Sequence, residues 1–164
     1  KNHHLVLEAL SILKRQGVEV LLICTGHMKD YRNEEYIHEL LDYVNTNSLK
    51  ENVKFLGLVP YEDVFKFIRF SELVINPSLF EGWSSTVEEC KSAGKMMLLS
   101  DLNVHQEQFP KAIFFQRNSA EDLAEKIKMI AENGVCNYRS ENSLEQRTQN
   151  FAAEYQEIVL DCLS

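Results

Sequence analysis

Apolar positions near the start of the chain recur at helical spacing. They are Leu5, Ala9, Ile12 and Leu13, and this periodicity predicts an amphipathic helix. Gly17 follows at a position where a helix commonly ends. The next segment, 18–24, is rich in β-branched residues and almost continuously apolar, which predicts a strand buried on both faces.

The same alternation continues along the chain. Short apolar runs predict further strands at 53–56, 73–75, 96–99 and 113–115. Helical stripes between them predict helices over about 37–44, 64–68 and 86–93. Ser119 with Asp122 predicts a capped helix start, and Gly134 marks the end of that helix. A last apolar stripe, which we expect to dock on the rest of the protein, comprises Phe151, Tyr155, Ile158, Val159 and Cys162.

Strands that alternate with helices predict an α/β fold with right-handed crossovers and a parallel sheet covered by helices on both faces. Ligands of such sheets bind outside the carboxyl ends of the strands, so the site is expected in the loops there. We expect one domain over 1–164. Because the chain opens on a helix, with Lys1 and Asn2 where a strand-to-helix loop would end, we expect an earlier strand of a longer protein to be missing.

The composition narrows the class of protein. The chain has 164 residues and a formal charge of −8, from 17 Lys and Arg against 25 Asp and Glu. This balance argues against a nucleic-acid partner, because neutralising phosphates needs clustered basic side chains. No apolar run approaches the roughly 18 residues that a membrane-spanning helix needs. The scattered cysteines, Cys24, Cys90, Cys136 and Cys162, form no C-x-x-C pair, which favours reduced thiols in a cytosolic setting.

The segment 76–89 carries the richest polar chemistry. The predicted strand runs into Pro77, which has no N–H group, and then into Gly82, which permits a close approach of the backbone. Three hydroxyl residues, Ser84, Ser85 and Thr86, are placed to cap the helix that follows. A helix N-terminus offers free N–H groups and partial positive charge, so this loop is suited to a phosphate or another oxygen-rich ligand.

Two carboxylates flank the start of this helix. Glu81 and Glu89 lie eight positions apart, one in the loop and one in the helix, so both are able to border one cleft. Carboxylate oxygens accept charge-assisted hydrogen bonds from sugar hydroxyls. The pattern leaves a second interpretation open, in which Glu89 is a solvated helix residue and Glu81 a partner of the helix dipole.

The spacing of Pro77-Ser78, Glu81-Gly82 and Glu89 matches a known motif. This stretch resembles the donor site of the family-four retaining glycosyltransferases, which have the GT-B architecture of two Rossmann-like domains facing a cleft. The resemblance covers the chain to about residue 133 and includes further matches at Gly26, 55–60, 93–101 and 104–107.

The resemblance implies a role for each matching residue. Glu81 would contact hydroxyls of the transferred sugar, and Lys1 would neutralise the pyrophosphate as it leaves. Glu89 would accept from the ribose of the nucleotide, and Leu58 would lie along the nucleobase. The other substrate-binding positions are Gly26 at a strand end and the segment of Gly82, Trp83, Ser84, Ser85 and Thr86, whose N–H groups would face the sugar and pyrophosphate.

The same resemblance implies transfer of a sugar from a UDP- or GDP-linked donor to an acceptor hydroxyl with retention, without a metal ion or cofactor. The family's N-terminal acceptor domain is missing, so this fragment is expected to bind the donor and to transfer nothing alone. Two departures concern the donor: Ser84 replaces a frequent glycine, and the arginine that usually accompanies the lysine is absent. The pair Trp83-Ser84 resembles a branch common in bacterial O-antigen and capsule assembly.

Other interpretations stay open from the sequence. A GT-B relative with other sugar-nucleotide chemistry, such as an epimerase, would share these motifs. A non-catalytic α/β interaction module would fill the loop at Glu81 with its own side chains. In another open alternative, the complete enzyme docks at the inner face of a membrane to reach a lipid-linked acceptor. The acidic composition of this fragment gives no sign of membrane binding. His105 with Glu107 is interpreted as a helix-start or loop contact.

Overall fold

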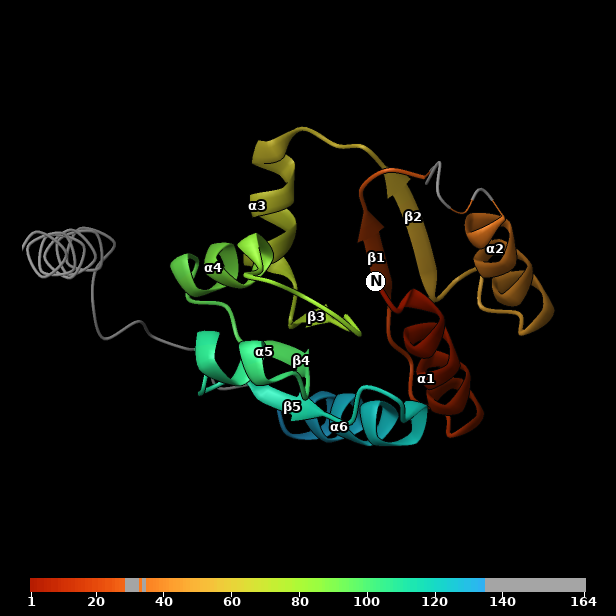
Figure 1. The fold of residues 1–164 in the computed structure, drawn as a ribbon. Helices are drawn as coiled ribbons and strands as arrows, with labels where there is room; N and C mark the ends of the chain where they lie inside the picture. Colours follow the sequence, from red (N-terminus) through yellow and green to blue (C-terminus); the bar gives the residue numbers. More distant parts are fainter. Residues whose placement is uncertain (29–32, 34, 135–164) are drawn as a thin grey trace, which may run out of the picture.

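The computed structural model describes residues 1–28, 33 and 35–134. Helices and strands alternate along this part of the chain (Figure 1). The five strands are β1 (Leu22–Thr25), β2 (Val53–Gly57), β3 (Val74–Asn76), β4 (Met97–Ser100) and β5 (Ile113–Phe115). The six helices are α1 (His3–Arg15), α2 (Tyr36–Thr46), α3 (Tyr61–Phe70), α4 (Ser85–Ser92), α5 (Asn103–Gln108) and α6 (Ala120–Asn133).

All strand pairs are parallel, as the sequence predicts. β1 pairs with β2, and β4 pairs with both β3 and β5. The strands form two sheets rather than the single sheet expected, because β1 and β3 are not hydrogen-bonded to each other. Within the described residues, each of these two strands is therefore paired along one edge only.

One large core joins the two sheets on one face. It contains apolar residues of α1, α2 and α6, together with Leu98 and Phe115 from the second sheet and Val53 from the first. α1 contacts both α2 and α6, so this helix joins the helices that lie against the two sheets (Figure 1). A buried apolar side chain contributes about 1.5–3 kcal/mol, which makes this shared core the main source of cohesion between the sheets.

A second core covers the opposite face of β3, β4 and β5. It contains residues of α3 and α4 as well as Met97 and Leu99 of β4. Leu98 of the same strand belongs to the first core, as expected for side chains that alternate between faces. The same face of β1 and β2 is less covered, since Ile23 and Leu56 are 41% and 43% exposed.

Most predicted elements are found within one to three residues of their expected ends. The Ser119 hydroxyl accepts a hydrogen bond from the N–H of Asp122 at 3.1 Å, so the predicted cap of α6 is confirmed. The first strand begins at Leu22 instead of residue 18, because β2 offers partners only from Val53 onward. The apolar stripe at 151–162, Cys136 and Cys162 lie outside the described residues. No helix in 1–28 or 35–134 is long and apolar enough to cross a membrane.

Candidate functional site

The loop between β3 and α4 is folded around a buried amide. Asn76, 4% exposed, is the last residue of β3. Its Oδ1 accepts from the N–H of Ser78 at 3.3 Å and is 2.8 Å from the Ser78 hydroxyl. Its Nδ2 donates to the Ser84 hydroxyl at 3.2 Å. One side chain thus ties together the beginning and the end of the loop.

Glu81 points back into this loop. Its Oε1 lies 3.0 Å from the Ser78 hydroxyl and 3.5 Å from Nδ2 of Asn76. The same oxygen receives a hydrogen bond from Nζ of Lys1, eighty positions earlier in the chain. The carboxylate is mostly buried, and its position is defined by three donors from two segments, the start of the chain and the end of β3 with the loop after it.

The backbone of Lys1 is also fixed. The Tyr36 hydroxyl donates to the carbonyl of Lys1 and accepts from the N–H of His3, both at 3.1 Å. Burial lowers the pKa of the Lys1 amine below its ordinary value of 10.5. The structure therefore brings Lys1 and Glu81 together, and Tyr36 orients the backbone of Lys1.

The start of α4 departs from the expected capping. Ser84 occupies the N-cap position, but its side chain makes no hydrogen bond to the first turn. The prediction that Ser84 caps α4 is therefore wrong; its hydroxyl accepts from Asn76 instead. The first N–H groups of an α-helix have no partner inside the helix, so those of Ser85 and Thr86 are left for other acceptors.

The two neighbouring glutamates of α4 have different partners. Glu89 accepts from the Tyr61 hydroxyl at 3.0 Å, and this bond raises the pKa of Tyr61 above its ordinary value. Glu88 accepts from Lys91 at 3.1 Å and from Gln108 at 2.9 Å. Glu89 therefore faces α3 and the loop that carries Leu58, while Glu88 faces α5.

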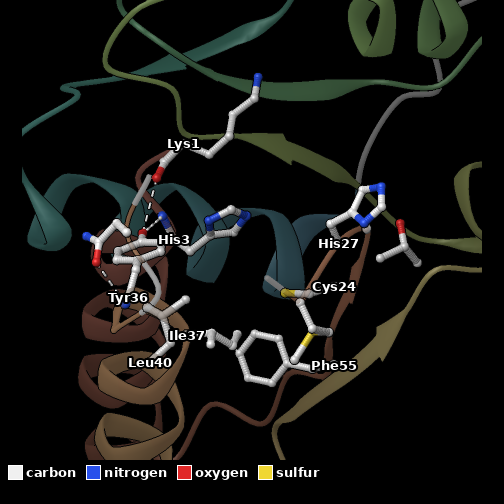
Figure 2. Close-up of a pocket in the computed structure, with 12 residues that line it drawn as sticks. Lys1, His3, Cys24, His27, Tyr36, Ile37, Leu40 and Phe55 are labelled. Carbon is white, nitrogen blue, oxygen red and sulfur yellow. Dashed lines mark hydrogen bonds between the residues drawn. The ribbon is translucent and has the colours of Figure 1, made fainter. Parts of the chain in front are cut away.

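A cavity of about 200 Å³ lies at the carboxyl end of β1 (Figure 2). Its lining includes Lys1, His3, Cys24 and Gly26 as well as the apolar side chain of Phe55. Figure 2 shows the His3 ring turned toward Cys24 and Phe55, while the Lys1 side chain extends away from them. Burial raises the pKa of the Cys24 thiol to about 11, so this thiol stays protonated at neutral pH.

The predicted glycine of this region has a conformation that explains its identity. Gly26 has φ 129°, a backbone conformation that residues with a side chain rarely adopt. Its N–H donates to the carbonyl of Gly57 at 2.9 Å, which joins the loops that follow β1 and β2. Gly26 and Lys1 thus line the same cavity.

The remaining predicted positions lie at the surface around this region. Gly82, Trp83 and Ser85 are exposed, and Leu58 is exposed on the loop after β2. Four contributors have no role in the sequence analysis, namely Tyr36, Tyr61, Asn76 and Gln108. Tyr61 directly follows the Leu58–Pro60 loop, so its approximate place near the site could have been predicted from the sequence. Nothing in the sequence indicates Gln108, because it acts through a contact 24 positions away.

The described residues include no group of three His, Cys, Asp or Glu side chains arranged to hold a metal ion. His105 is fully buried, with Nδ1 2.9 Å from the carbonyl of Ser100. A carbonyl only accepts, so Nδ1 carries the proton, and Nε2 has no hydrogen-bond partner. His105 lies in the first turn of α5, which agrees with the interpretation as a helix-start contact, although the sequence analysis did not predict the range of this helix.

The alternation of parallel strands and helices is that of a GT-B protein, and comparison with known proteins agrees. The family model described as "Glycosyl transferases group 1" matches residues 1–151. The chain belongs to this family, which confirms the prediction of a GT-B glycosyltransferase. No curated protein sequence matches the chain.

Solved structures share the fold. HepE from Anabaena, in complex with UDP and glucose, has a TM-score of 0.72 and 22% identity, over 81% of this chain and 36% of that protein. A glycosyltransferase from Rickettsia africae has a TM-score of 0.72 and 19% identity, over 97% and 45%. Sucrose-phosphate synthase from Thermosynechococcus elongatus has a TM-score of 0.67 and 17% identity, over 81% and 34%. The chain therefore spans less than half the length of these proteins.

Proposed function

We propose that this chain is the donor-binding domain of a retaining glycosyltransferase that takes its sugar from a UDP- or GDP-linked donor. The observation that carries the proposal is the meeting of Lys1 and Glu81 beside the uncapped start of α4. A cation and free N–H groups suit a diphosphate, and an adjacent carboxylate suits sugar hydroxyls. Membership of the family supports glycosyl transfer as the reaction, and the groups at the site support a nucleotide diphosphate sugar as the ligand.

Each group has a part in this proposal. The N–H groups of Gly82, Trp83, Ser85 and Thr86 and the Lys1 amine bind the diphosphate, while Glu81 accepts from hydroxyls of the transferred sugar. The Ser84 N–H does not take part, contrary to the sequence-based expectation, because it donates to Gln108. Glu89, oriented by Tyr61, accepts from the ribose. Leu58 is exposed on the neighbouring loop, where it is able to lie along the base. The HepE complex with UDP makes UDP the first nucleotide to test.

The chemistry follows from these positions. As the bond from the anomeric carbon to the diphosphate breaks, positive charge builds on the sugar and negative charge on the leaving oxygen. Lys1 and the α4 N–H groups stabilise that negative charge, which is the kind of preorganised electrostatic contribution that dominates many enzymatic reactions. An acceptor hydroxyl that arrives on the same face of the sugar gives retention without a protein nucleophile.

We propose that the complete protein has a further parallel strand between β1 and β3 and an acceptor domain before this one. The support is that β1 and β3 are each paired along one edge in the described residues, while residues of α1 share one core with residues of both sheets. Hydrogen exchange on a chain extended upstream tests this proposal. Stronger protection of β1 and β3 is expected, and unchanged protection would contradict it.

Isothermal titration of the 164-residue chain with UDP, UDP-glucose, GDP and GDP-mannose tests the proposed function. We expect saturable binding of one nucleotide and its sugar derivative. A folded chain that binds none of the four would overturn the proposal. For variants of Glu81 and Glu89 in the same titration, Glu62→Ala is the matched control. Glu62 is an exposed carboxylate on α3 beside Tyr61 and has no part in the proposed site, so binding should not change.

Product analysis with the complete enzyme separates the two candidate reactions. A transferase gives a glycosylated acceptor whose anomeric configuration matches that of the donor. An epimerase-like enzyme instead gives an altered sugar without an acceptor. Extracts of bacterial surface polysaccharide precursors are the first acceptors to test, because the pair Trp83-Ser84 resembles the branch that assembles them.

A further inference from the structure

Gln108 makes a two-point contact with the peptide backbone at the start of α4. It is the last residue of α5 and is 3% exposed. Its Oε1 accepts from the N–H of Ser84 at 3.1 Å, and its Nε2 donates to the carbonyl of Ser84 at 2.8 Å. The amide therefore satisfies both polar groups of one buried residue, as a neighbouring strand would.

This contact fixes the start of α4 without capping it, since both bonds are to the backbone of Ser84 and not to the N–H groups of the first turn. An N-cap side chain ordinarily bonds the first turn and thereby fixes how the helix begins. At α4 the Ser84 hydroxyl is used by Asn76, and the Ser84 carbonyl starts the helix by accepting from the N–H of Glu88 at 3.3 Å. Gln108 holds that same carbonyl, so it fixes the direction in which the first turn leaves the loop.

Gln108 also controls the charge beside this turn. Its Nε2 lies 2.9 Å from Oε1 of Glu88, which accepts from Lys91 as well. A carboxylate near a helix N-terminus competes with any anionic ligand for the N–H groups and the dipole there. Because Gln108 and Lys91 hold Glu88 on the α5 side, its carboxylate is kept from that competition.

We propose that Gln108 is a positioning residue for the diphosphate of the donor, acting through the Ser84 backbone and through Glu88. The inference rests on the proposed function, since it assigns the first turn of α4 to the diphosphate. Gln108 itself is buried behind the turn and touches no ligand. A leucine at this position would keep the volume and lose all three hydrogen bonds.

Affinity for a series of ligands with two, one and no phosphates tests the proposal. Gln108→Leu should weaken UDP binding about tenfold and UMP binding less, while binding of uridine stays unchanged. The equivalent guanosine series applies if the wild type prefers GDP. A uniform loss across the series, or no loss, would overturn the assignment. Asn52→Ala is the matched control, because it removes a side-chain bond to the Val20 carbonyl at the opposite end of the strands.

A second variant and a measurement on the wild type keep the test decisive if the leucine variant does not fold. Gln108→Asn retains the amide but is one methylene too short to reach both groups, so about a threefold selective loss for UDP is expected. In the wild type, the Ser84 N–H should exchange slowly without ligand, and those of Ser85 and Thr86 should become slow only with UDP. Rapid exchange at Ser84 would contradict the proposal, whereas a wild type that binds no nucleotide removes the proposed function and this inference together.

Discussion

The amine of Lys1 lies against the carboxylate of Glu81, a contact between the first residue of the chain and a loop eighty positions later. The contact joins the residues just before α1 to the loop that follows β3. Lys1 is about half exposed and Glu81 largely covered, so the pair is accessible from the lysine side. In the proposed function both partners contact the donor, so a bound diphosphate would compete with Glu81 for the lysine.

Glu81→Gln should separate binding of the nucleotide from binding of the sugar. Without the carboxylate, Lys1 is free for the diphosphate, so UDP should bind at least as tightly as to the wild type. The sugar loses a charge-assisted acceptor, so UDP-glucose should bind about tenfold more weakly. Calorimetry with both ligands measures the difference. An equal loss for UDP and UDP-glucose would contradict the role of Glu81.

Lys1→Met should weaken UDP binding about tenfold and reduce its dependence on salt, because a cation near the diphosphate is removed. Lys50→Met, at an exposed position just before β2, is the matched control and should change neither property. Burial lowers the pKa of Lys1 below its ordinary value of 10.5, so the amine loses its charge at a lower pH than an exposed lysine. The affinity of the wild type for UDP should therefore fall as the pH rises through this lowered pKa. A salt dependence that survives Lys1→Met would point to another cation.

Tyr61→Phe removes the hydroxyl that orients Glu89 and keeps the ring. We expect about threefold weaker UDP binding, a small effect because the side chain is 63% exposed. Glu89→Gln should have a larger effect, and the double variant should lose little more than Glu89→Gln alone, since both changes act on one interaction. Additive losses measured by calorimetry would show that the two residues act independently.

His105 should make the protein less stable in mild acid. Burial lowers its folded pKa below the ordinary 6.5, so the unfolded chain binds the proton more tightly. This contribution is complete above about pH 6.5 and is lost as the pH falls toward the lower folded pKa. One such group changes the free energy of unfolding by at most about 1.4 kcal/mol per pH unit.

Urea unfolding of His105→Asn between pH 7.5 and 5.0 measures this contribution. The variant should be less stable at pH 7.5 but should lose less stability on acidification than the wild type. His3 also has a pKa lowered by burial, so part of the acid sensitivity should remain. A slope unaffected by His105→Asn would contradict the assignment.

The fold was largely readable from the sequence because each buried element carries a local period. The stripe of α1, the end of that helix at Gly17 and the cap at Ser119 all depend on neighbours within a few positions. α5 was missed because its six residues are too few to display a helical period. The split between β1 and β3 was also missed, since pairing depends on which strands are adjacent in space.

The candidate site also combines residues that the sequence indicates with residues that only the packing of distant segments reveals. Glu81 and Lys1 were singled out through a motif, and the structure places them in contact. The behaviour of Ser84 was predicted incorrectly, because its hydroxyl had to choose between α4 and Asn76. Local preference favours the cap, whereas the buried amide of Asn76 needs a partner wherever the fold places it. Gln108 and Tyr36 are likewise visible only once distant segments are packed together.

The shared core around α1 has a mechanical consequence. With no hydrogen bonds from β1 to β3 in the described part of the chain, side-chain packing around this helix is what keeps the cavity at Gly26 and the loop at Glu81 in fixed relation. Trimming a deeply buried leucine of α1, such as Leu7, would weaken that packing and with it the alignment of the two halves of the candidate site. In the complete protein, the strand proposed between β1 and β3 would share this task with α1.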